Sequence, residues 1–134
     1  MQAPQPTKAD LAKPKFHLLQ GQALNEVAQV AAFGADKYGE HNWKAGQGLH
    51  FSRIFNALMR HAWAWWRGET IDPETGLHHM AHAAWNALAL VEYAYLCKGI
   101  DDRERQGNDD DGKTEKDEAE PYPSIFNTCN TPNR

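Results

Sequence analysis

The chain has 134 residues, of which 41% are apolar and 24% are charged, enough for one small hydrophobic core but not for two. It has no run of 18 apolar residues and no signal-peptide pattern in residues 1–12, which excludes a membrane span and leads us to expect a cytoplasmic location. Ten of the 18 acidic residues fall between residues 100 and 120, so the rest is mildly basic, which suits anionic small ligands but not direct nucleic-acid binding.

Composition divides the chain into three parts. Residues 1–12 are polar and proline-spaced, and we expect a flexible N-terminus. Residues 13–99 contain all the strong helical patterns and are predicted to form one domain. Residues 100–134 combine an Asp/Glu/Lys run with three prolines, which predicts an acidic, disordered tail.

The first predicted helix covers about residues 22–38 and ends before Gly39, a common C-terminal stop. Its apolar stripe at helical spacing consists of Leu24, Val27, Val30, Ala31 and Ala35.

The second predicted helix starts at Ser52, a favourable N-cap, and ends at Arg67 before Gly68. A third covers about residues 77–98, after the turn-forming residues 72–76. Because no segment alternates between apolar and polar residues, we expect no sheet.

Taken together, these patterns predict an all-α fold, a compact bundle of three main helices. Trp63, Trp65 and Trp66 follow one another too closely for all three rings to face one core. We therefore expect the core to be completed by association of chains, and hence a homo-oligomer.

Polar residues interrupt the third helix. His79, His82 and Asn86 lie at i, i+3 and i+7 and share one face, next to small alanines. A short connection centred near Asp72 joins the second and third predicted helices, so we expect these helices to pair in an antiparallel way. Counting residues outward from the connection then places His61 of the second helix near His82 of the third. Asp72 would lie at the mouth of the site, near the start of the third helix.

The same count around the longer loop between the first and second predicted helices places Glu26 within about two helical turns of these imidazoles. One carboxylate with several imidazoles can hold a divalent metal ion, although a single helical histidine is more often structural. The predicted metal ligands are Glu26, His61, Asp72, His79 and His82.

Arg53, Arg60 and Arg67 repeat every seven residues and line one side of the second helix. They form either a solvated face or a track for phosphate, which arginine binds in two-pronged fashion. Arg60 adjoins His61 and is the best phosphate candidate.

In residues 33–43, two glycines flank a lysine and an aromatic residue. Lys37 could contact phosphate, Tyr38 or Trp43 could stack on a base, and Asn42 could read its edge. We add Asn86, from the polar row, to these predicted substrate-binding residues. The alternative is a helix end with a packed turn.

Several separate stretches, in order, resemble a known family. They are KPKFHLL (13–19), FGADKYGEHNW (33–43), RHAWAWWRGE (60–69), DPETGL (72–77) and HHMAHAAWNAL (78–88). They look like the N-terminal domain of phage dATP/dGTP diphosphohydrolases, which is related to the MazG-like all-α nucleotide pyrophosphohydrolases.

The resemblance implies hydrolysis of dGTP or dATP to the monophosphate and pyrophosphate, with Mg²⁺ or a similar ion, in phage nucleotide metabolism. One departure concerns the ion. MazG-like enzymes use an acidic quartet, whereas here Glu26 is followed by Gln29, and the later helix offers His79 and His82. Imidazole ligands favour Mn²⁺, Co²⁺ or Zn²⁺.

The sequence therefore supports an enzyme in which Glu26, His61, Arg60 and His82 are the catalytic residues. Two alternatives remain open at this point. The pocket could bind a nucleotide or a partner without catalysis, or the bundle could be an assembly module with its tryptophans in an interface.

Overall fold

The computed structural model describes residues 2–104. Three helices form its body: α1 (Gly21–Tyr38), α2 (Phe51–Trp66) and α3 (His79–Leu96). Two single 3₁₀ turns, η1 (Phe16–Leu18) and η2 (Asn42–Lys44), precede α1 and follow it. Within the described residues there are no strands, only two isolated bridges, so the prediction of an all-α bundle is confirmed.

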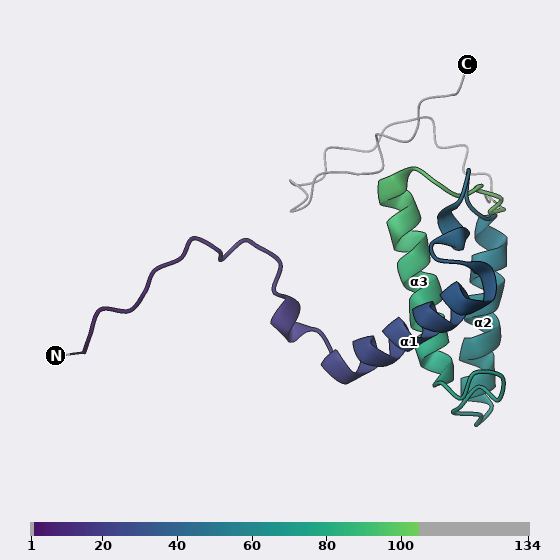
Figure 1. The fold of residues 1–134 in the computed structure, drawn as a ribbon, viewed down its shortest axis with the longest axis horizontal. Helices are drawn as coiled ribbons and strands as arrows, with labels where there is room; N and C mark the ends of the chain where they lie inside the picture. Colours follow the sequence, from purple (N-terminus) through teal and green to yellow (C-terminus); the bar gives the residue numbers. More distant parts are fainter. Residues whose placement is uncertain (1, 105–134) are drawn as a thin grey trace, which may run out of the picture.

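Helix α3 is the shared partner of the other two helices. In Figure 1, α2 and α3 lie side by side, α1 crosses α3, and the residues before α1 project away from the bundle as an arm. Small side chains let the helices approach closely, because Ala81 packs between Val27 and Val30 of α1. None of the helices in the described part of the chain is long and apolar enough to cross a bilayer.

The ends of α1 and α2 are determined in different ways. Helix α1 ends at Gly39, as predicted, where φ is 94° and a side chain would be strained. Ser52 is not the N-cap of α2, because the helix begins one residue earlier and His50 occupies that position. The Ser52 amide instead donates to Asp102 Oδ1 at 2.9 Å, and its hydroxyl donates to the other oxygen of that carboxylate.

This cap comes from residues that follow α3, which local sequence cannot reveal. The chain returns to the start of α2, where the Phe51 amide donates to the Ile100 carbonyl at 2.9 Å. Contacts with the bundle thus continue past residue 99, the predicted end of the domain. The remainder of the predicted tail, residues 105–134, lies outside the described residues.

The loop between α1 and α2 is fastened to the C-terminal end of α3. Tyr93 is fully buried; its hydroxyl accepts from the Leu49 amide at 2.9 Å and donates to the Trp43 carbonyl. Lys98 donates to two further loop carbonyls at 2.6 and 2.7 Å. These bonds hold the Trp43 ring against α3, where it meets Trp85 edge-on at 5.7 Å.

Candidate functional site

Three histidines from two helices form a cluster. The His61 ring of α2 stacks on the His82 ring of α3, with centroids 4.3 Å apart and planes 6° from parallel. His61 Nδ1 also lies 2.9 Å from Nδ1 of His79. The antiparallel neighbours α2 and α3 thus bring together the residues that hairpin counting had paired.

The turn before α3 brings a carboxylate to the same place. Asp72 is 8% exposed and folds the turn locally, since its carboxylate accepts from the Thr75 hydroxyl at 2.9 Å and the Glu74 amide at 3.3 Å. His82 Nε2 lies 3.4 Å from Asp72 Oδ2 and 2.7 Å from the Thr75 hydroxyl. Asp72 was a predicted site residue, whereas Thr75 had been read only as part of a turn.

His61, Asp72 and His82 make up a group that could hold a metal ion, because one ligand atom from each lies within 4.8 Å of the others. The 3.4 Å between His82 Nε2 and Asp72 Oδ2 suits two ligands of one ion, each about 2.1 Å from it. Two imidazole nitrogens and one carboxylate oxygen are a common donor set for a divalent transition metal. We call these three residues the donor group.

Electrostatics favour neutral imidazoles and an ionised carboxylate in the donor group. Burial lowers the pKa of His61 and His82, and the nearby charge of Asp72 opposes this only in part. The pKa of Asp72 is also below its ordinary value: burial acts to raise it, but the hydrogen bonds from Thr75 and Glu74 and the charge of His82 outweigh that effect. Near neutral pH the group therefore consists of two neutral imidazoles and one anion. Because the Thr75 hydroxyl donates to Asp72, His82 Nε2 donates to that hydroxyl, and this proton has to leave Nε2 before the nitrogen can bind an ion.

Two predicted ligands lie beside the donor group rather than in it. Glu26 of α1 accepts a hydrogen bond from the His78 amide at 2.6 Å, and its charge acts on the pKa of His82. His79 has both ring nitrogens engaged, one by His61 and the other by Glu69 Oε1 at 2.8 Å. Sequence analysis missed Glu69, which follows the end of α2 and belongs to no periodic pattern.

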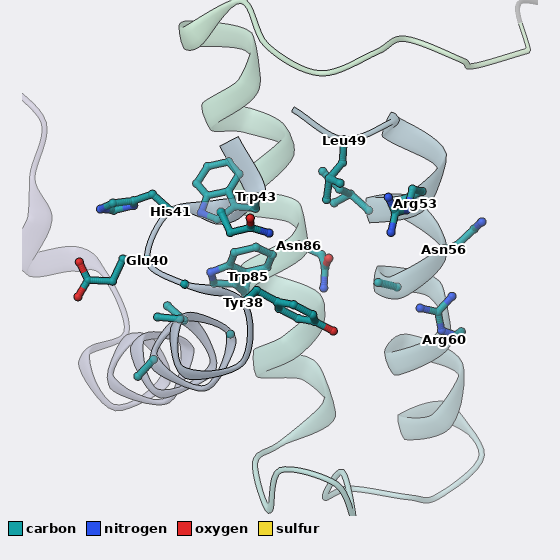
Figure 2. A pocket seen from close by; sticks show the side chains of 18 residues that line it. Tyr38, Glu40, His41, Trp43, Leu49, Arg53, Asn56, Arg60, Trp85 and Asn86 are labelled. Atoms are coloured by element: carbon teal, nitrogen blue, oxygen red, sulfur yellow. The ribbon is translucent and has the colours of Figure 1, made fainter. Parts of the chain in front are cut away.

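A pocket of about 870 Å³ opens between α1 and α2, with α3 as its floor. Figure 2 shows Tyr38, Trp43, Trp85 and Asn86 between the two helices, while Glu40 points away. The wall formed by α2 carries Arg53, Asn56 and Arg60.

Most predicted substrate-binding residues line this pocket. Tyr38, Asn42, Trp43 and Asn86 are among them, from the end of α1, η2 and α3. Lys37 is not; its ammonium pairs with Glu74 at 3.0 Å, and that hydrogen bond raises the pKa of the lysine.

Of the arginine track, Arg53 and Arg60 line the pocket, and Arg67 does not. Sequence analysis passed over Asn56, which lies between these two arginines on the same helix. The one-sided spacing of the arginines could have drawn attention to it.

None of the three donor residues lines the pocket, but the two sites use the same helices α2 and α3. Asn86 lines the pocket, and its side-chain amide donates to the backbone carbonyl of His82 at 2.8 Å. Arg60 lines the pocket from α2 and immediately precedes His61. A ligand in the pocket would therefore lie against the same two helices that supply His61 and His82.

Comparison with known proteins identifies the family of the chain. The family model described as dATP/dGTP diphosphohydrolase, N-terminal, matches residues 4–103. The chain belongs to this family. The match includes the helices, the pocket and the donor group, and no solved structure matches the chain.

A curated member of the dATP/dGTP diphosphohydrolases, from Salmonella phage PMBT28, is 43% identical over 77 residues. That alignment covers 58% of this chain but only 26% of the phage protein, so the chain spans about a quarter of its relative's length. The name of the relative describes the whole phage protein.

Proposed function

We propose that this domain hydrolyses a purine deoxynucleoside triphosphate, dGTP or dATP, to the monophosphate and pyrophosphate. The observation that carries the proposal is that α2 and α3 line a pocket of about 870 Å³ and also supply His61 and His82 to the donor group. That volume is within the usual range for small-molecule sites, roughly 300–1,000 Å³. The name of the phage relative supports this choice of substrate.

The lining suggests how the nucleotide would lie. Tyr38 and Trp43 offer aromatic faces for a purine, and Asn42 offers an amide for its edge. Arg53 and Arg60 would face the phosphates and point them toward the donor group. The triphosphate would then lie along α2, with the base near η2.

His61, Asp72 and His82 would hold a divalent ion. When bound, that ion would polarise the phosphate oxygens and make a water molecule more acidic. Mg²⁺ is the usual ion for nucleotide hydrolysis, but two imidazoles beside one carboxylate favour Mn²⁺, Co²⁺ or Zn²⁺. We therefore expect higher activity with one of these ions than with Mg²⁺.

In the reaction, the oxygen of water bonds to the α-phosphorus as the bond to the α–β bridging oxygen breaks. Glu26 is the proposed proton acceptor: its Oε1 is held by the His78 amide, which leaves Oε2 for the proton of the water. Arg60 would stabilise the negative charge that develops on the departing pyrophosphate. His61 and His82 would serve as ligands of that ion when it is bound.

The test is a turnover assay on the full chain with dGTP, dATP and the other nucleoside triphosphates, each with Mg²⁺, Mn²⁺ and Co²⁺. We expect pyrophosphate and a purine monophosphate, and a loss of at least about 10²-fold in kcat for Glu26→Gln and His82→Ala. Glu92→Ala, an exposed change on α3, is the matched control.

Absence of turnover across the whole panel would contradict the enzyme proposal. If nucleotides then raised the melting temperature, the pocket would be a binding site without catalysis. The donor group contains only one carboxylate, fewer than MazG-like enzymes use, and this favours such a binder as the second candidate.

We further propose that residues 13–99 form the functional domain and that it associates into a homo-oligomer. Leu88, Val91 and Tyr95 share one face of α3, and each is more than half exposed. Trp63 and Trp66 of α2 are 51% and 69% exposed. A second copy of the chain would remove these side chains from water.

The phage origin of the relative supports a role in phage nucleotide metabolism, within the cytoplasm of an infected cell. Expression of the active protein in bacteria should lower the cellular dGTP or dATP pool. Unchanged pools despite activity in vitro would contradict this role.

A further inference from the structure

His79 is the most deeply buried polar side chain of the site, at 4% exposure, yet it is not in the donor group. Its Nε2 lies 2.8 Å from Glu69 Oε1, and its Nδ1 lies 2.9 Å from His61 Nδ1. The backbone holds this arrangement, because the His79 amide donates to the Thr70 carbonyl at 2.9 Å. The residue next to Glu69 is thereby tied to the start of α3.

The two contacts assign the hydrogen atoms of both rings. A carboxylate only accepts hydrogen bonds, so His79 Nε2 carries the proton that bonds to Glu69. In the neutral ring, His79 Nδ1 then has a lone pair and can only accept. His61 Nδ1 must therefore donate, and the lone pair of His61 lies on Nε2.

We infer that Glu69 and His79 are positioning residues, which fix His61 in the Nδ1–H tautomer so that its Nε2 lone pair is presented to a metal ion. This inference rests on the proposed function, since it assigns how one proposed ligand is oriented. Histidine ligands elsewhere are held in the same way by a hydrogen bond from the ring nitrogen that does not bind metal. Here a second histidine transmits the influence of the carboxylate.

The same hydrogen bonds exclude His79 as a ligand of the ion in this arrangement. One of its nitrogens carries a proton, and the lone pair of the other is taken by His61. The role of His79 would therefore be orientation rather than coordination.

The first measurement needs neither metal nor substrate. Long-range ¹H–¹⁵N spectra of the metal-free full chain, at about pH 8 and so above the ordinary histidine pKa near 6.5, report the tautomer of each ring. We expect His61 protonated at Nδ1 and His79 protonated at Nε2. A His61 ring protonated at Nε2 would overturn the inference.

Matched variants then test whether the hydrogen bonds from Glu69 through His79 to His61, which we call the relay, determine the tautomer, or whether His79 only fills space. His79→Leu removes the acceptor, and His61 should shift toward the Nε2–H tautomer that free histidine favours in water. His79→Asn can present its amide oxygen close to the former Nδ1 and should restore the Nδ1–H tautomer. Equal tautomer populations in the wild type and His79→Leu would overturn the inference.

Cobalt affinity links the relay to the proposed site. We expect His79→Leu to weaken Co²⁺ binding by about 10- to 100-fold, with most of the loss recovered in His79→Asn, and Glu69→Ala to fall between the two. If the wild type binds Co²⁺ and His79→Leu binds it equally well, the positioning role is wrong. If the wild type binds no Co²⁺, Mn²⁺ or Zn²⁺, the proposed metal site fails, whereas the tautomer result stands by itself.

Discussion

The stacked rings of His61 and His82 set the chemistry at the residue scale. With centroids 4.3 Å apart, two charged imidazolium rings would repel each other strongly in a partly buried setting. Burial lowers the pKa of both rings, and the repulsion from His82 lowers that of His61 further, while Asp72, whose pKa is also lowered, is ionised beside them near pH 7. The net charge of the donor group therefore suits the cation proposed for it.

Asp72→Asn should weaken metal binding while preserving the fold. The amide oxygen can still accept from Thr75 and Glu74, so the turn is retained, but the only negative charge of the donor group is lost. We expect at least about a 10-fold loss of Co²⁺ affinity, measured by calorimetric titration. Unchanged affinity with an unchanged melting temperature would contradict the assignment of Asp72 as a ligand.

Stability should fall in mildly acidic solution. Because the pKa values of His61 and His82 in the folded chain lie below the ordinary value near 6.5, the unfolded chain binds more protons at pH values just under 6.5. Their contribution to stability is complete above about pH 6.5 and is lost as the pH falls through the folded values. Asp72 adds a further loss only at more acidic pH, because its pKa is lowered from 3.8.

Urea denaturation of the metal-free chain between about pH 8 and pH 5 measures this loss. His82→Asn, which removes one of the two titrating rings, should give a flatter dependence on pH. A pH dependence as steep as that of the wild type would show that His82 does not contribute.

At the scale of elements, α3 organises the site from both ends. Its N-terminal half supplies His79 and His82, and its C-terminal end, through Tyr93, fastens the loop that carries Trp43. One donor residue, His82, and the anchor of the aromatic wall, Tyr93, thus share one helix, which fixes the separation of these two points. Such placement on regular structure is more precise than placement on loops.

Gly99→Ala tests this anchoring. A methyl group there would lie 2.3 Å from the Phe51 ring and 2.7 Å from the Tyr93 ring, and φ is +88°. We expect a loss of about 1–3 kcal/mol in the free energy of unfolding, measured by urea denaturation. Gly21→Ala is the control: nothing lies within 4 Å of the added methyl group, and the change should be neutral or stabilising. Similar stability for the two variants would contradict the anchoring role.

At the scale of the whole molecule, three helices leave much apolar surface uncovered. Val91→Lys places a charge in the centre of the exposed stripe on α3 and should split the proposed oligomer into single chains, as measured by light scattering after gel filtration. Glu92→Lys, on the neighbouring exposed position, is the control and should retain the oligomer. A wild-type mass of one chain at all concentrations would contradict the oligomer.

The helices themselves could be predicted from the sequence because their information is local. The predicted bounds of α1, α2 and α3 lie within about two residues of the observed ones. They followed from the periodic apolar residues, from Gly39 and from the turn at residues 72–76. The proximity of His61 to His82 followed from counting along an antiparallel pair. The Asp102 cap on α2 could not be found in this way, because it depends on where the chain lies after α3.

By itself, the sequence determined the helical architecture and the family, and it supplied candidate residues for binding a nucleotide and a metal ion. Only the tertiary structure decided which of them share a site. It grouped Asp72 with His61 and His82, set Glu26 and His79 beside them, and paired Lys37 with Glu74 outside the pocket. The physical reason is that the two kinds of information come from different distances along the chain. Helical periodicity is local and fixes the face on which a residue lies. Hydrogen-bond partners and ligand geometry depend instead on distances of a few ångströms between segments that are remote in the chain.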